Sequence, residues 1–382
     1  MLSGLMKSKA LVFAAVVVVS GSTFAGDYPQ QSDGVRWPGK AWPEADGSEP
    51  YARGELEAEI HRIYGENMGP FFNGARGVVV IHKGKLVAEA YRDGYNRSSR
   101  FVSWSQGKSI TQALVGIAVR EGLLEVTAPA RVPEWAGDER ADITLEDLLR
   151  MSSGLKFEEG AGGLDDNSQM LFGDGRTDVG TFAINQPLIH ERGKHWAYAT
   201  GTSMILSRIV RDAVAGTGDT YYDFIHRELI GPLGMTSAVP EMDKSGTFLG
   251  GTSFYATTRD YARFGLLYLR GGMWNGRRIL PEGWVDFTRS ETSNSDGNYA
   301  VHFWLNPLGG AEALAEKGLS LPDDMFQARG MGGQFIAIFP SRDVVIAYNG
   351  FVVGNVPYSP IDGLFARLLD ILEVASKTPV EP

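Results

Sequence analysis

The sequence predicts an α/β protein in which a mostly helical insertion interrupts the α/β domain. Two short apolar runs at residues 77–81 and 86–91 have the pattern of a β-hairpin. Two further runs, at 335–339 and 344–348, have unbroken apolar character that predicts strands buried on both faces. The intervening residues 105–289 are mostly helical in pattern. Strands at both ends of a helical middle therefore predict a discontinuous α/β domain with an all-α insertion.

The first 25 residues have the pattern of a secretory signal peptide. Lys7 and Lys9 supply the positive start, residues 10–19 form the apolar core, and Thr23 and Ala25 stand where a signal peptidase reads small residues. The apolar core is shorter than the roughly 20 residues that span a bilayer, so an uncleaved anchor is the less favoured alternative. We therefore expect an exported protein, periplasmic or secreted, with no stable membrane insertion after cleavage.

The composition restricts the classes of partner. The formal net charge is −10, and removing Lys7 and Lys9 with the signal peptide would bring it to −12 (−10 minus 2). An acidic exported protein has no electrostatic basis for binding nucleic acid, so a small molecule is the expected partner. The chain has no cysteine, which excludes disulfides, thiol catalysis, lipoprotein anchoring and cysteine-ligated metal.

Beyond the signal peptide, the pattern divides the chain into a strap and two domains. Residues 26–52 are rich in proline, glycine and aspartate and carry Trp37 and Trp42, which predicts an extended strap laid across the domain. Helical patterns that end at or before glycines, or close the chain, occur at 54–64, 202–215, 260–269 and 361–374. The predicted domain ranges are 53–103 with 298–376 for the discontinuous α/β domain, and 104–297 for the mostly helical domain.

Ser105-Gln106-Gly107-Lys108 is the segment with the clearest chemistry, because it opens an almost wholly apolar helical run to Glu121. A spacing of three places the Ser105 hydroxyl and the Lys108 amine on one helical face. A serine hydroxyl is a poor nucleophile until a base takes its proton, and burial lowers the pKa of an amine enough to make it that base. The segment therefore predicts a serine hydrolase that works by Ser-Lys chemistry.

A second S-x-x-K copy, Ser153 to Lys156, is an internal control. Thr144 and Asp147 have the spacing of a capping box that opens a short helix, and Gly154 is expected to end that helix. Lys156 would then follow in extended chain on no face shared with Ser153, so this copy is expected to be accidental.

Two further segments supply candidate partners for Ser105. Tyr198 lies at the start of the predicted helix 202–215, where a phenol near an ammonium can relay protons; simple packing is the alternative. Residues 330–334, Gly-Met-Gly-Gly-Gln, lead directly into the strand at Phe335. A backbone N–H there, with that of Ser105, would form an oxyanion hole, and the alternative is a tight turn or a β-bulge.

Other hydrolase and cofactor-binding motifs are absent from the sequence. There is no G-x-S-x-G, no H-E-x-x-H, no P-loop and no G-x-G-x-x-G before a helix. His190 and His195 are five residues apart, and Asp165-Asp166 is expected to be a solvated loop. We therefore predict no metal and no organic cofactor.

Seven segments resemble, in order and spacing, the penicillin-recognising serine hydrolases, a β-lactamase-related family that includes class C β-lactamases, family VIII esterases and 6-aminohexanoate-dimer hydrolases. The likeness runs from about residue 54 to residue 372 and is closest to the last branch. It implies a β-lactamase/transpeptidase-like fold, with an antiparallel sheet flanked by helices. The segments are 101–109, 148–154, 196–198, 231–235, 259–265, 276–281 and 330–334.

The resemblance also implies roles for individual residues. Ser105 takes the position of the acyl-accepting nucleophile, Lys108 that of its amine partner, and Tyr198 that of the motif tyrosine. The second oxyanion amide would be that of Gln334 or its neighbour. The substrate-binding segment, where β-lactamases carry K-T-G, is Met331, Gly332 and Gly333.

Departures from the family pattern bear on the substrate. Met331 cannot attract a carboxylate as the K-T-G lysine does, and the direction of nearby Arg329 is open. Gly160 stands where 6-aminohexanoate hydrolases tend to have tyrosine. These departures favour an ester or simple amide substrate, with β-lactamase or D,D-peptidase activity as the alternative. A non-catalytic penicillin-binding or ligand-sensing protein is the alternative of another class.

Overall fold

The computed structural model describes residues 28–45, 53–62, 75–160, 163–305, 311–350 and 359–377. The predicted signal peptide, and residues 46–52 of the predicted strap, lie outside this part of the chain. The principal helices are α1 (Arg53–Arg62), α2 (Gln106–Arg120), α3 (Leu145–Leu149), α4 (Asp166–Phe172), α5 (Val179–Ile184), α6 (Thr200–Ala215), α7 (Tyr221–Ile225), α8 (Gly231–Leu233), α9 (Thr258–Leu269), α10 (Trp284–Arg289), α11 (Ala311–Ala315) and α12 (Ser359–Lys377).

The strands form one large and two small sheets. Six strands make the large sheet in the order β2-β1-β11-β10-β9-β8, and every neighbouring pair is antiparallel. The strands are β1 (Ala75–His82), β2 (Lys85–Tyr91), β3 (Arg100–Val102), β4 (Val239–Pro240), β5 (Phe254–Thr257), β6 (Met273–Trp274), β7 (Arg277–Arg278), β8 (Trp304–Leu305), β9 (Phe326–Gly330), β10 (Gln334–Phe339) and β11 (Val344–Gly350).

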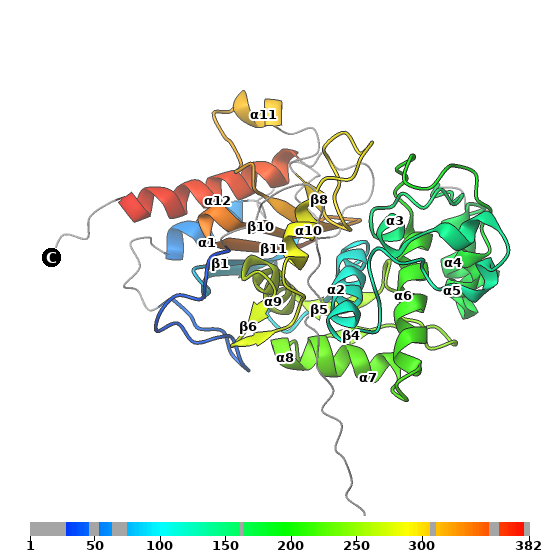
Figure 1. Ribbon diagram of the computed structural model, residues 1–382. Coiled ribbons are helices and arrows are strands. Elements are labelled where there is room, and N and C mark those ends of the chain that lie inside the picture. The colour runs from blue at the N-terminus through cyan, green and yellow to red at the C-terminus, as the bar shows by residue number, and fades with distance from the viewer. Residues whose placement is uncertain are drawn as a thin grey trace, which may run out of the picture.

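Pairing of β1 with β11 joins the two ends of the chain into this large sheet. Alternate residues of the central strands enter two separate cores, as the two-residue period of a strand requires. Ile336 and Val345 pack with the helical middle of the chain, whereas Phe335 and Ile346 pack against α1 and α12. In Figure 1, α1 and α12 cover one face of the sheet and α9 the other. The prediction that β10 and β11 are buried on both faces is confirmed.

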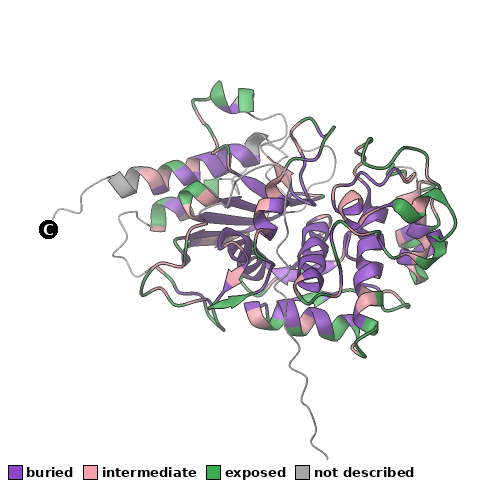
Figure 2. Cartoon of the chain, viewed as in Figure 1, coloured by how far each residue is buried: buried purple, intermediate pink, exposed green. Residues whose placement is uncertain are grey.

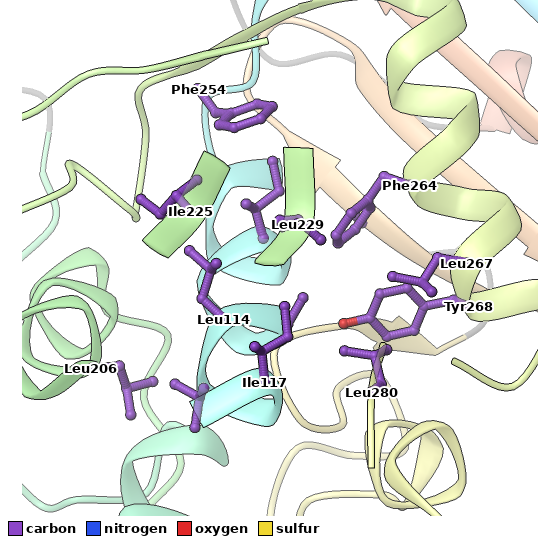
Figure 3. Close-up of a cluster of buried hydrophobic side chains, with 14 of the residues drawn as sticks. Leu114, Ile117, Leu206, Ile225, Leu229, Phe254, Phe264, Leu267, Tyr268 and Leu280 are labelled. Atoms are coloured by element: carbon purple, nitrogen blue, oxygen red, sulfur yellow. The ribbon is translucent and has the colours of Figure 1, made fainter. Parts of the chain in front are cut away.

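Helix α2 is the centre of the helical part. Every residue from Gln106 to Val119 is buried, and Figure 2 shows α2 enclosed among the other elements. Leu114 and Ile117 point into a cluster with Leu206 of α6 and Tyr268 of α9 (Figure 3). Two of the polar side chains of α2 are buried with partners: Ser109 Oγ donates to His302 O, and Thr111 Oγ1 donates to Gly250 O.

Within the described residues, the predicted helices and strands are confirmed to within a few residues, with one exception at α3. The capping box is present: Thr144 Oγ1 accepts from Asp147 N at 3.1 Å. However, α3 ends at Leu149, and Met151 takes the left-handed conformation with φ 57° before Gly154 is reached. Gly154 was therefore wrongly predicted as the end of α3. It also has positive φ, and a Cβ there would overlap the His190 carbonyl oxygen, so it is needed for a close approach of two loops.

The described part of the strap is held against β2 and β6. Trp42 is buried, and the Trp37 ring lies 5.2 Å from that of Trp274. Leu86 N of β2 donates to Pro43 O, and Ala45 N donates to Leu86 O. No helix within the described ranges combines the length and apolar character that crossing a bilayer requires.

Helix α9 approaches the sheet closely at Gly265. A Cβ at this position would stand 2.5 Å from Val345 Cγ1 and 2.8 Å from Ile336 Cγ2, both on stiff β-branched side chains in the core. We predict that Gly265→Ala lowers the free energy of unfolding by about 1–3 kcal/mol, because overpacking outweighs the gain in helix propensity. Urea unfolding followed by circular dichroism measures this. Gly54→Ala in α1 is the matched control, because its Cβ would meet nothing within 4 Å. A Gly265→Ala protein as stable as wild type would contradict the close packing of α9 on the sheet.

Candidate active site

Ser105 lies at the N-terminus of α2, immediately after a sharp turn out of β3. Trp104 has φ 45°, a left-handed conformation that is rare for a bulky residue. Ser103 fixes the same turn, because its Oγ donates to Thr252 O at 2.9 Å and accepts from Phe254 N at 3.1 Å. The turn therefore presents Ser105 at a fixed place at the end of a buried helix.

Lys108 meets Ser105 one helical turn later. Its Nζ lies 3.0 Å from Ser105 Oγ, 2.8 Å from Thr200 Oγ1 and 3.2 Å from Gly251 O. The side chain is 1% exposed, and burial lowers the pKa of Lys108 to about 8, against the opposing effect of the Glu159 charge. About a tenth of such amines are neutral at pH 7, so the spacing predicted from sequence places an available base beside the hydroxyl.

Tyr198 lies two residues before α6 with its ring face towards Lys108. The Nζ atom is 4.7 Å from the ring centroid, and the ring packs against Tyr299 and Trp304 at 5.8 and 5.4 Å. Burial raises the pKa of Tyr198, although a hydrogen bond with Ser105 acts in the other direction. The phenol therefore stays protonated at neutral pH and can hydrogen-bond to the reacting oxygen.

The glycine-rich segment forms the tight turn between β9 and β10 and also lies beside Ser105. Gly330 and Gln334 are paired across the two strands, and Gly332 and Gly333 have φ values of 73° and 83°. A Cβ at Gly330 would lie 3.2 Å from Ser105 N and would overlap the Ser103 carbonyl oxygen. Glycine is needed at position 330 because only a bare Cα lets the turn approach the backbone amide of Ser105.

Gln334 is anchored at the start of β10. Its Oε1 accepts from Asn349 Nδ2 at 2.9 Å, and its Nε2 donates to the Gly350 carbonyl oxygen. These contacts leave the Gln334 side chain buried in the sheet, so the part of Gln334 available for an oxyanion role is its backbone amide.

Met331 and Arg329 differ in direction. Met331 is 59% exposed at the tip of the turn. Arg329 is buried, with Cζ 5.5 Å from the Trp304 ring centroid. Its charge also partly offsets the burial that raises the pKa of Asp362 to about 6. Arg329 therefore does not take the exposed position that a cation binding a substrate carboxylate would need.

Thr200, Gly251 and Glu159 surround the site although sequence reasoning did not single out their roles. The Thr200 backbone N–H donates to a carboxylate oxygen of Glu159 across 41 residues of chain. Gly251 supplies its carbonyl from a loop 143 residues beyond Lys108. Such separations leave no spacing signal. The one available hint was that Thr200 begins α6, whose N-cap residue Ala199 has no side chain able to cap it.

The second S-x-x-K copy does not form a pair. Lys156 Nζ lies near Glu158 and Asp166, at 3.2 and 3.6 Å, whereas Ser153 Oγ accepts from Leu155 N. Asp165 accepts from Ser168 N at 3.0 Å and caps α4, so the prediction of a solvated loop at 165–166 is wrong.

The described residues contain no group of three or more metal-ligating side chains of the His, Cys, Asp or Glu type. The rings of His190 and His195 stack with centroids 4.0 Å apart.

A family model described as Beta-lactamase matches residues 72–360, more than half of the chain. The chain belongs to the β-lactamase family of serine hydrolases. The resemblance identified from the sequence is therefore confirmed, as is the predicted α/β class with an antiparallel sheet flanked by helices.

The chain is also similar to individual proteins of known name. The 6-aminohexanoate-dimer hydrolase of Paenarthrobacter ureafaciens is 24% identical over 270 residues, which cover 64% of this chain and 68% of the relative. Among solved structures, a candidate 6-aminohexanoate-dimer hydrolase from Bacillus anthracis aligns with TM-score 0.66 and 21% identity, covering 90% of this chain and 89% of the other. A family VIII carboxylesterase aligns with TM-score 0.64 and 15% identity, covering 84% and 97%. At these identities the structures show a shared fold.

Burial of the Lys108 amine has a cost that depends on pH. Its pKa is about 8 in the folded protein and 10.5 in its ordinary state, so the unfolded chain holds more protons between these values. Stability gained from this group therefore falls as pH drops from about 10.5 to 8 and stays low below that. We predict that Lys108→Met raises the free energy of unfolding at pH 7 by about 1–3 kcal/mol. This is the free energy that corresponds to the lowered pKa, minus the contribution of the hydrogen bonds that the variant loses.

Chemical denaturation of wild type and Lys108→Met from pH 7 to pH 10.5 measures the effect, and the two stabilities should converge as the pH rises. A constant difference in the free energy of unfolding over this range would show that burial does not lower the pKa of Lys108.

Proposed function

We propose that the protein hydrolyses an ester or amide bond through an acyl-enzyme on Ser105. The observation that carries the proposal is the buried Lys108 Nζ, 3.0 Å from Ser105 Oγ. Thr200 Oγ1 and Gly251 O accept the two protons of a neutral amine. The remaining lone pair then points to Ser105, which is the arrangement that a general base needs.

Acylation follows from this geometry. As Ser105 Oγ bonds to the substrate carbonyl carbon, its proton passes to Lys108 Nζ. The oxyanion that develops is held by the backbone N–H groups of Ser105 and of Gln334 or its neighbour, each worth roughly 3–4 kcal/mol. Collapse of the intermediate breaks the bond to the leaving group, which takes a proton relayed through Lys108 and Tyr198.

Deacylation repeats these steps with water as the nucleophile. Lys108, neutral again, takes a proton from the attacking water, and Tyr198 can hydrogen-bond to the oxygen of Ser105 as it leaves. The proton returns to Ser105 Oγ when the acyl bond breaks. No step calls for a metal or an organic cofactor.

The turn beside Ser105 favours esters and simple amides over β-lactams. Met331 is the exposed residue there, and Arg329 is turned into the protein. The relatives named a 6-aminohexanoate-dimer hydrolase and a family VIII carboxylesterase agree with this class of substrate. Gly160, in place of the tyrosine found in the aminohexanoate hydrolases, favours the esterase side. The signal-peptide pattern of residues 1–25 supports a periplasmic or secreted site of action.

We predict that Ser105→Ala lowers kcat for a short-chain p-nitrophenyl ester about 10⁴-fold or more, because the acyl acceptor is lost. Ser153→Ala, in the second S-x-x-K copy, is the matched control and should retain wild-type turnover. Circular dichroism should show the same fold for both variants. A fluorophosphonate probe followed by peptide mass analysis should label Ser105 in the wild type.

Other outcomes of the same assays would redirect the function. Full activity in Ser105→Ala would refute the assignment of the nucleophile. Turnover of nitrocefin in preference to esters and amides would favour β-lactamase activity instead. A stoichiometric adduct without turnover of any substrate would indicate a ligand-sensing protein.

A further inference from the structure

We propose that Glu159 is a positioning residue, which holds the partner hydroxyl of Lys108 in place and balances the charge of the Lys108 ammonium during acyl transfer. The inference rests on the proposed function, since it assigns Lys108 the role of base. It adds Glu159 to the group of Ser105, Lys108 and Tyr198. Glu159 contacts Thr200, which lies 41 residues further along the chain.

The geometry is a chain of two hydrogen bonds. A carboxylate oxygen of Glu159 accepts from the backbone N–H of Thr200, the first residue of α6. Thr200 Oγ1 then accepts from Lys108 Nζ at 2.8 Å. Thr200 is 2% exposed, and the preceding Ala199 cannot cap the helix, so Glu159 takes the place of the missing cap. The carboxylate thus fixes the backbone of the residue whose hydroxyl orients the amine.

The Glu159 carboxylate also affects the pKa of Lys108. Glu159 raises the pKa of Lys108 and acts against the burial that lowers it. Three titratable neighbours of the site are uncharged at neutral pH: burial raises the pKa of Tyr198 and of Tyr299, and it lowers the pKa of His302 to about 3. Glu159 is therefore a negative charge that acts directly on the Lys108 ammonium.

The reaction explains why such a charge is useful. Before acylation, Lys108 and Ser105 are a neutral amine and an alcohol; proton transfer converts them into an ammonium and a developing oxyanion. The backbone amides stabilise the oxyanion, and Glu159 stabilises the ammonium through Thr200 and through space. A base without this charge would be neutral at lower pH but would accept the serine proton less readily.

The chain offers a matched pair of variants. Glu159→Gln removes the charge and keeps an oxygen that can accept from Thr200 N. Glu158→Gln removes an exposed neighbouring charge whose partner is Lys156, outside the site. Measuring both variants separates the charge of Glu159 from general effects on the loop.

The test is the pH profile of kcat/KM with an uncharged p-nitrophenyl ester. We expect the acid limb of Glu159→Gln to move to lower pH by about 0.5–1 unit, and kcat at the plateau to fall about 3–10-fold. Glu158→Gln should have the wild-type profile. Raising the ionic strength should move the wild-type limb in the same direction as Glu159→Gln and leave that variant's limb nearly unchanged, because Glu159 is partly screened by solvent.

Two results would overturn the inference while leaving the proposed function standing. The first is a Glu159→Gln enzyme with Ser105-dependent turnover and an unshifted acid limb. The second is a loss of thermal stability without a change in the pH profile, which would make Glu159 a helix cap only. If wild type itself shows no Ser105-dependent turnover, the proposed function fails and takes this inference with it.

Discussion

Burial of one amine is the constraint on which the rest of the site depends. A lysine ammonium is among the most costly groups to remove from water, and α2 buries Lys108 almost completely. The protein compensates with acceptors from two distant parts of the chain, Thr200 at the start of α6 and the carbonyl of Gly251. The remaining cost appears as a lowered pKa, so the feature that weakens the fold is the one that provides a base near neutral pH.

The elements packed around α2 make the burial of Lys108 possible. The helix is buried along nearly its whole length and packs against α6, β9 and β10. Its N-terminus emerges from this core at the strained turn of Trp104, and the turn between β9 and β10 reaches the same point because Gly330 has no side chain. Segments far apart in the sequence, at Gly251 and at Gly330, meet at Ser105 and Lys108, so the site forms only when these parts of the chain fold together.

The sequence predicted those features of the fold and site that depend on short segments of the chain. The unbroken apolar runs of β10 and β11, the largely apolar run of α2 and the separation of Ser105 from Lys108 by three residues are properties of short segments, and the structure follows them. The contact between Glu159 and Thr200 could not be predicted, because it depends on where a loop returns after an irregular path. The end of α3 was missed for a related reason: Gly154 has positive φ because it packs against a loop near His190, and a sequence gives no means of distinguishing that use from a helix stop.

The division between a buried reacting pair and an exposed turn has a consequence for specificity. Ser105 and Lys108 are held by contacts in the core, where a substitution disturbs packing as well as chemistry. Met331 projects from the tip of a turn and has no such restriction. In the proposed function, a methionine in place of a cation there would alter which substrate is attracted without altering how its carbonyl is attacked. Under the proposed function, reacting groups in the core and selectivity on a turn would let the substrate change at little cost to the fold. Arg329, next to this turn, is buried beside Trp304, so Met331 is the exposed side chain at the tip of the turn.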